Sequence, residues 1–120
     1  MRRLICALFF SFMCMSIVWA VQLNKLVVDI QNGFKGQNVT VIINNICMWS
    51  SENSFSDEVI SFVDSFEFRY TKGTNLIVKV IVDKEEYVKE LKPDDEIFLG
   101  IQRENNNIVF EISKIPFVYD

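Results

Sequence analysis

Histidine is absent from this 120-residue chain, and it contains only three cysteines, two prolines and four glycines. Without histidine, neither a Ser-His-Asp triad nor a Cys-His pair can be assembled. One cysteine after residue 20 and no imidazole also exclude the common zinc-ligand sets. Four scattered glycines cannot build a glycine-rich phosphate loop. The acidic residues fall mainly in expected turns and on alternating strand faces, so we expect a non-enzymatic protein without a cofactor or metal.

The first twenty residues differ from the rest of the chain. Arg2 and Arg3 precede an apolar run that extends from Leu4 to Ala20 and is interrupted only by serines. A basic start, an apolar stretch and a small final residue are typical of a secretory signal peptide. We therefore predict that residues 1–20 are a cleaved leader and that residues 21–120 form one secreted, extracellular domain. The alternative is an uncleaved anchor, because the stretch from Leu4 to Val21 is 18 residues long, near the lower limit for a membrane-spanning helix.

The remaining hundred residues are strongly acidic. Removal of Arg2 and Arg3 leaves ten basic against sixteen acidic residues, a net charge of −6. Such a chain repels the phosphate backbone of nucleic acids and the anionic surface of membranes. We therefore expect neither nucleic acid nor a membrane as a partner after cleavage of the leader.

The composition after residue 20 favours β-structure. No alanine occurs there, leucine occurs five times, and valine and isoleucine together supply 25 residues. β-Branched side chains suit strands better than helices. Alternating apolar residues predict short strands over 26–30, 38–43, 46–49, 65–70, 76–82, 87–91, 97–101 and 108–112. About seven or eight such strands predict a single antiparallel β-sandwich or small barrel, with one candidate helix near 57–63.

Local signals add further expectations about the connections. Lys72-Gly73 is expected to close a hairpin, and Ser50 to Ser56 is expected to be a polar loop. Gly100 lies inside an expected strand, which predicts a bulge or a close approach of another group. Asn38-Val39-Thr40 is an N-glycosylation sequon in a chain with a secretion signal, so Asn38 is a candidate glycosylation site.

Ile46-Cys47-Met48-Trp49 places four apolar residues beside the polar Ser50–Ser56 stretch. Such a run is either a core strand or an exposed contact patch, so Cys47, Met48 and Trp49 are the candidate interaction residues. We favour the core interpretation, with Cys47 buried and the protein monomeric. An exposed Cys47 would instead permit a disulfide-linked dimer, because no other cysteine remains after the leader.

These observations together predict a small secreted protein that acts by binding an extracellular protein. The alternative is a carrier of a small molecule or lipid, with a cavity lined by aromatic side chains. The residues that would line such a cavity are Phe62, Phe66, Phe68 and Tyr70, although aromatic residues at a spacing of two are more often part of the core.

Overall fold

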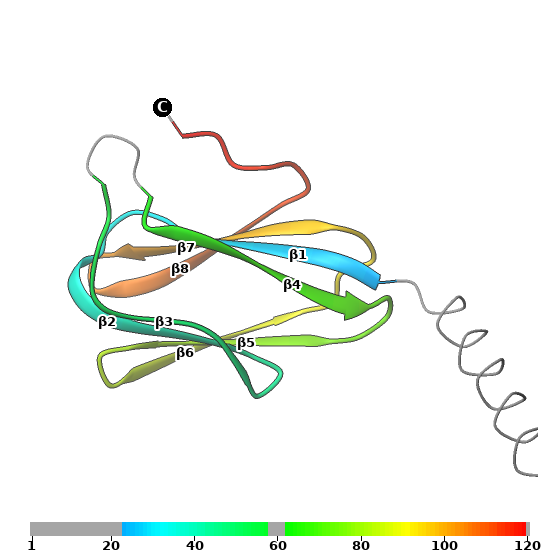
Figure 1. The fold of residues 1–120 in the computed structure, drawn as a ribbon, viewed down its shortest axis with the longest axis horizontal. Coiled ribbons are helices and arrows are strands. Elements are labelled where there is room, and N and C mark those ends of the chain that lie inside the picture. The colour runs from blue at the N-terminus through cyan, green and yellow to red at the C-terminus, as the bar shows by residue number, and fades with distance from the viewer. Residues whose placement is uncertain (1–22, 58–61, 120) are drawn as a thin grey trace, which may run out of the picture.

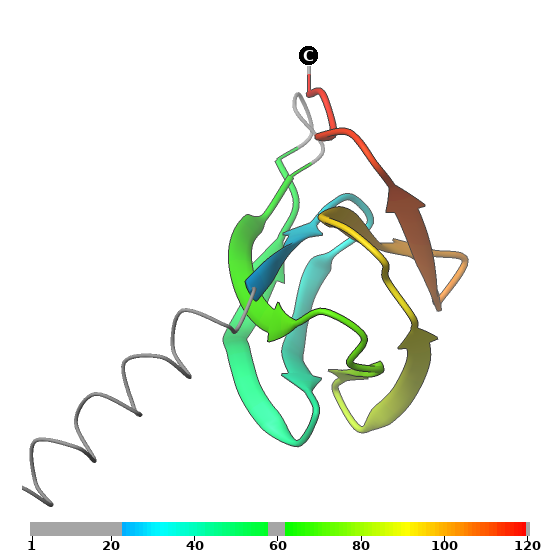
Figure 2. The same cartoon turned by 90° about the vertical axis from the view of Figure 1, so that its right-hand side faces the viewer.

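The computed structural model describes residues 23–57 and 62–119, and these form a sandwich of two four-stranded sheets (Figures 1 and 2). The strands are β1 (Leu23–Ile30), β2 (Lys35–Ile43), β3 (Ile46–Phe55), β4 (Asp64–Thr71), β5 (Leu76–Val82), β6 (Glu85–Leu91), β7 (Ile97–Glu104) and β8 (Asn107–Ser113). Sheet A has the order β4-β1-β7-β8, and sheet B has the order β3-β2-β5-β6. The predicted mostly β sandwich is confirmed, and the sheets do not close into a barrel.

Two predictions fall wholly or mainly outside the described residues. The signal peptide over 1–20 lies entirely outside them. The candidate helix near 57–63 lies mainly outside them, and Asp57, Phe62 and Val63, which flank the gap, are not helical. No helix occurs in the two ranges that the structure describes.

The core lies between the sheets and is built by strict alternation along the central strands. On β2, Val39, Val41 and Ile43 are fully buried. The same pattern places Leu26, Val28 and Ile30 of β1, Leu76, Val78, Val80 and Val82 of β5, and Ile97, Leu99 and Ile101 of β7 in the core. Because successive residues of a strand point to opposite faces, these sets meet in one continuous apolar layer.

The connections differ from the expected all-antiparallel arrangement. β1 and β7 are parallel, with Val28 opposite Leu99, whereas the other pairs are antiparallel. The expected hairpin at Lys72-Gly73 is also wrong, because β4 pairs with β1 in sheet A and β5 belongs to sheet B. The turn therefore carries the chain from one sheet to the other, and the apolar pattern of a strand does not specify its partner.

The expected loop from Ser50 to Ser56 is wrong as well, because β3 continues to Phe55. Ser50 lies opposite Thr40 of β2, and their hydroxyl oxygens are 3.1 Å apart. β3 is an edge strand, so much of its surface faces solvent and polar side chains are tolerated there. Register shifts along the β2–β3 pair also interrupt the alternation from which the strand would have been predicted.

Candidate functional site

An apolar strip lies along one side of the sandwich, where the edge strands β3 and β4 of the two sheets face each other. Phe66 and Phe68 of β4 lie opposite the core residues Val28 and Leu26, so their side chains point toward the inside of the sandwich. On β3, Ile46 lies opposite Ile43 and Trp49 opposite Val41, which places them on the inner face as well. We call Ile46, Met48, Trp49, Phe66 and Phe68 the apolar strip.

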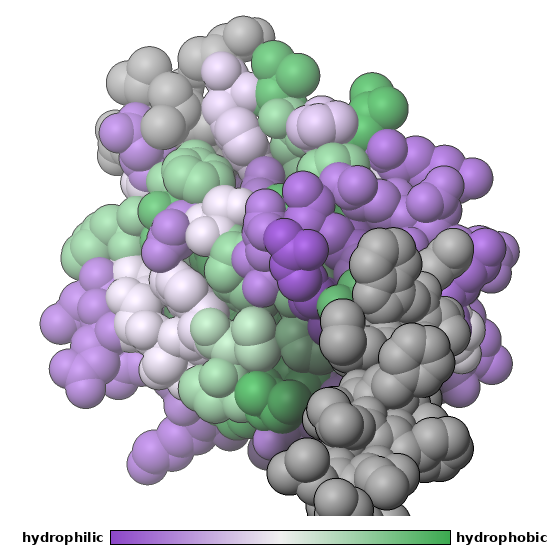
Figure 3. All heavy atoms as spheres, turned by 45° about the vertical axis from the view of Figure 1, so that its right-hand side comes forward, coloured by the Kyte–Doolittle hydropathy of each residue, from purple (hydrophilic) through white to green (hydrophobic). Residues whose placement is uncertain are grey.

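The strip is partly exposed because no further strand of residues 23–57 and 62–119 covers this side. Ile46 is 56% exposed, and the other members are half-buried against the core. Figure 3 looks obliquely at the sandwich, and green and white side chains gather in the middle of this view between purple margins. One polar link crosses the gap between the sheets: the Trp49 indole Nε1 donates a hydrogen bond to Asp64 Oδ2 at 2.8 Å. This bond fixes the indole ring while leaving the strip open to solvent.

The three candidate interaction residues are thus consecutive but do not share one environment. Met48 and Trp49 pack partly against the core, whereas Cys47 is exposed. The prediction that Cys47 is buried is wrong. The cause is a β-bulge: the register passes from Val41–Trp49 to Ile42–Cys47, which leaves Met48 as the extra residue and turns Cys47 to the outer face.

Asn38, the candidate glycosylation site, lies exposed near the beginning of β2. Its backbone N–H donates to Asp83 Oδ1 at 3.0 Å, and its side-chain oxygen Oδ1 accepts a hydrogen bond from the Asn53 backbone N–H at 3.2 Å. Both contacts leave the amide nitrogen, to which a glycan is attached, without a bond within the described residues. Glycosylation of Asn38 stays a prediction.

A second feature, which the sequence analysis missed, lies on the outer face of sheet A. Residues 114–119, here called the tail, follow β8 and run back over this face (Figure 1). Asp29 lies near the end of β1 and Gln31 directly follows that strand, and both polar side chains point to the outer face of sheet A. Beneath the tail they are nevertheless only 8% and 4% exposed. Buried polar groups need partners, and the tail supplies one of them through Tyr119.

The partners of these two side chains form a continuous hydrogen-bonded network. Tyr119 Oη donates to Asp29 Oδ2 at 2.7 Å and accepts from Gln31 Nε2 at 2.9 Å. Ser65 Oγ donates to the other carboxylate oxygen of Asp29 at 2.7 Å. Gln102 Nε2 donates to Gln31 Oε1 at 2.6 Å. The network therefore joins β1, β4, β7 and the tail. Burial raises the pKa of the Tyr119 hydroxyl, and its hydrogen bond to the Asp29 carboxylate raises this pKa further.

Gly100 makes room for this network. A Cβ atom at position 100 would lie 2.6 Å from Gln31 Oε1 and 2.8 Å from the Gln31 amide carbon. The Gln31 amide therefore rests directly on the backbone of β7. The predicted close approach at Gly100 is confirmed, and the approaching group is the side chain of Gln31.

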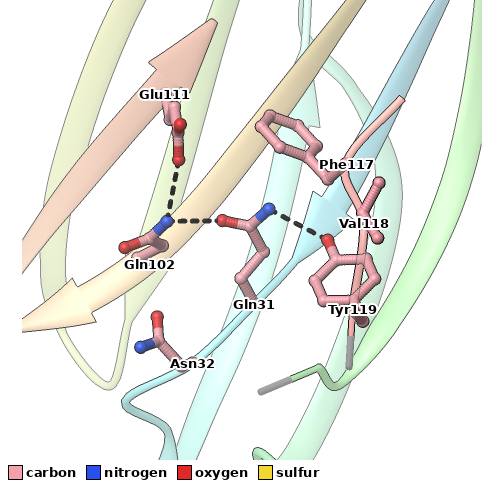
Figure 4. Close-up of a pocket in the computed structure, with 7 residues that line it drawn as sticks. All are labelled: Gln31, Asn32, Gln102, Glu111, Phe117, Val118 and Tyr119. Carbon is pink, nitrogen blue, oxygen red and sulfur yellow. Dashed lines mark hydrogen bonds between the residues drawn. The ribbon is translucent and has the colours of Figure 1, made fainter. Parts of the chain in front are cut away.

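A pocket of about 300 Å³ opens beside the network, between the tail and β7 and β8 (Figure 4). It is lined by Gln31, Asn32, Gln102, Glu111, Phe117, Val118 and Tyr119. In Figure 4 the aromatic rings lie on the tail side, and Gln102, Glu111 and Asn32 lie across from them. We call this cavity the tail pocket.

No three His, Cys, Asp or Glu side chains in residues 23–57 and 62–119 come together in a way that would hold a metal ion. Within the same ranges, no helix has the length and apolar character needed to cross a bilayer. Of the four aromatic residues of the carrier hypothesis, Tyr70, Phe66 and Phe68 belong to or pack against the core, whereas Phe62 contacts the Tyr119 ring at 5.1 Å.

Comparison with known proteins gives no assignment. No protein-family model matches the chain. No curated protein shows significant similarity to it.

Proposed function

We propose that this chain is a small secreted, non-enzymatic protein that binds another extracellular protein through the apolar strip. The observation that carries the proposal is the partly exposed inner-face row between two strand edges, in which Ile46 is exposed and Met48, Trp49, Phe66 and Phe68 are half-buried. Contiguous exposed apolar side chains are uncommon on soluble monomers and mark contact surfaces. Aromatic residues and methionine are also enriched in the core of protein interfaces.

The arrangement of the strip suits an extended segment of the partner. β3 and β4 are the edge strands of their sheets, so each presents backbone N–H and C=O groups on the side that faces the strip. A strand that adds to such an edge makes main-chain hydrogen bonds and places every second side chain on the apolar surface. We therefore expect a partner segment with apolar side chains at alternate positions.

Charge adds a second requirement for the partner. Asp64 on β4 is exposed and contacts the strip through its bond to Trp49, and the chain carries a formal net charge of −4. Complementary charges accelerate association and reject partners of like charge. The expected partner segment therefore combines its apolar positions with flanking lysine or arginine residues.

The packing of the interior favours a protein-binding function over the alternative function as a carrier of small molecules. The buried side chains of both sheets form one cluster, and Phe66 and Phe68 pack against that cluster. These aromatic residues therefore fill space between the sheets, where a carrier would hold its ligand. The leader pattern at residues 1–20 supports secretion.

Photo-crosslinking tests the proposal with a matched control. Ile46 in the strip and Val88 on β6 are 56% and 57% exposed, and they lie on opposite edges of sheet B. A photo-reactive phenylalanine analogue is placed at position 46 in one sample and at position 88 in the other. Each protein is then irradiated in the extracellular fluid of its source, and the adducts are mapped by mass spectrometry.

The proposal predicts an adduct from position 46 that position 88 does not give, attached to an alternating apolar segment with basic flanks. No specific adduct from position 46, or equal adducts from both positions, would contradict it. An adduct between two copies of this chain would also contradict it, because the strip would then be covered by self-association.

A further inference from the structure

We propose that the tail pocket binds a sugar ring, which is a second binding activity separate from the apolar strip. The pocket combines three side-chain amides, one carboxylate and two aromatic rings. Neighbouring hydroxyls of a sugar each donate and accept hydrogen bonds, and amides and carboxylates supply both kinds of partner. The apolar C–H face of a sugar ring packs against an aromatic ring, which Phe117 provides.

The size of the pocket limits the ligand. Its volume of about 300 Å³ lies at the lower end of the range for small-molecule sites, roughly 300–1,000 Å³. One pyranose ring with its substituents suits this space, whereas a lipid chain or a large aromatic ligand does not. The pocket is also open to solvent, so a ring at the end of a longer glycan can enter.

The network beneath the pocket leaves suitable groups unused. Gln102 Nε2 donates both to Gln31 Oε1 and to Glu111 Oε2, at 2.6 and 3.0 Å, so the Gln102 carbonyl oxygen and one Glu111 oxygen stay available. The Asn32 side-chain amide forms no hydrogen bond within the described residues and lies at the pocket wall. These groups present two acceptors and one amide to a ligand without any rearrangement of the network.

The neighbouring bonds also hold the wall in place before a ligand arrives. Gln31 is 4% exposed and is held by Gln102 on one side and by Tyr119 on the other. The Tyr119 ring packs against Phe62 at a centroid distance of 5.1 Å. A site with fixed polar groups loses less conformational entropy on binding. The tail is therefore part of the binding site and serves as its aromatic wall.

Saturation-transfer difference NMR tests this proposal on the secreted protein. The probes are the methyl α- and β-pyranosides of glucose, galactose, mannose and N-acetylglucosamine, each at about 10 mM, a concentration that fills even a weak millimolar site. We expect saturation of the ring protons of at least one probe. Preference for one anomer shows that the site contacts the anomeric substituent, and binding of either methyl glycoside shows that a glycosidically linked ring can enter.

The location of the ligand is tested with variants that spare the fold. Asn32→Ala removes an amide without internal bonds, and Phe117→Ala removes the aromatic wall. Asn107→Ala at the start of β8 and Phe55→Ala at the end of β3 are the matched controls outside the pocket. The proposal predicts at least tenfold weaker binding for the two pocket variants and unchanged binding for the controls. No saturation with any probe, or equal binding by pocket variants and controls, would overturn it.

Discussion

The hydroxyl of Tyr119 should contribute measurably to the stability of the whole domain. Among the described residues, it is the single polar atom through which the tail joins the network, with bonds of 2.7 Å to Asp29 and 2.9 Å to Gln31. The substitution Tyr119→Phe removes this atom and keeps the ring that packs against Phe62. The carboxylate of Asp29 then retains the Ser65 hydroxyl as its remaining side-chain partner.

The size of the effect follows from burial and charge. Asp29 is 8% exposed, and a hydrogen bond to a charged group contributes about 1.5–3 kcal/mol to stability. The tail can also detach and let water reach Asp29, so the loss cannot exceed the free energy with which the tail is docked. We therefore expect Tyr119→Phe to lower the free energy of unfolding by about 1.5–3 kcal/mol.

Urea denaturation followed by far-UV circular dichroism measures this change. Tyr87→Phe is the matched control, because the Tyr87 hydroxyl also bonds a carboxylate, that of Glu85 at 2.7 Å, but at an exposed site. We expect the control to change stability by less than about 0.5 kcal/mol. A double-mutant cycle with Asp29→Asn assigns the coupling to the pair. An effect of Tyr119→Phe no larger than that of the control, with no coupling to Asp29, would refute the claim that the Tyr119 hydroxyl stabilises the domain through Asp29.

Three other predictions concern Cys47, Asn38 and Tyr119. Cys47 should react with iodoacetamide in the native protein at a rate similar to that in urea, and slow native labelling would contradict its exposure. Secretion from a eukaryotic host should give a glycosylated form that peptide-N-glycosidase and Asn38→Gln both remove, whereas an unchanged mass after both treatments would disprove the site. The raised pKa of Tyr119 means that folding favours the protonated hydroxyl, so this contribution is full below a pH of about 10 and is lost above it. Denaturation at rising pH should show that loss, and Tyr119→Phe should reduce it.

Much of the fold was predictable because apolar residues at alternate positions indicate which face of a strand is buried. Val39, Val41 and Ile43 point inward as their spacing predicts, and the strand predicted over 76–82 is present as β5. Pairing partners were not predictable in this way. The parallel contact between β1 and β7 joins residues about 70 positions apart, and no local pattern encodes such a long-range contact.

The candidate sites were likewise only partly predictable from the sequence. The segment Ile46–Trp49 was recognisable as apolar, but the bulge at Met48 decides which of its side chains reach solvent. Asp29 was expected on a solvated strand face, and only the path of the tail buries it. Gly100 was the one signal of a close contact on that face, and the sequence did not identify Gln31 as the approaching group.

The most direct test of the binding proposal uses Trp49 as the reporter. Trp49 is the only tryptophan after residue 20 and belongs to the apolar strip. A synthetic peptide of the cross-linked partner segment is titrated into the wild type, Ile46→Glu and Val88→Glu. We expect Trp49 emission to shift to shorter wavelengths, with affinity reduced at least about tenfold, or about 1.4 kcal/mol, for Ile46→Glu and within about twofold for Val88→Glu. Equal affinities for the two variants, or no change in Trp49 emission, would contradict binding at the strip.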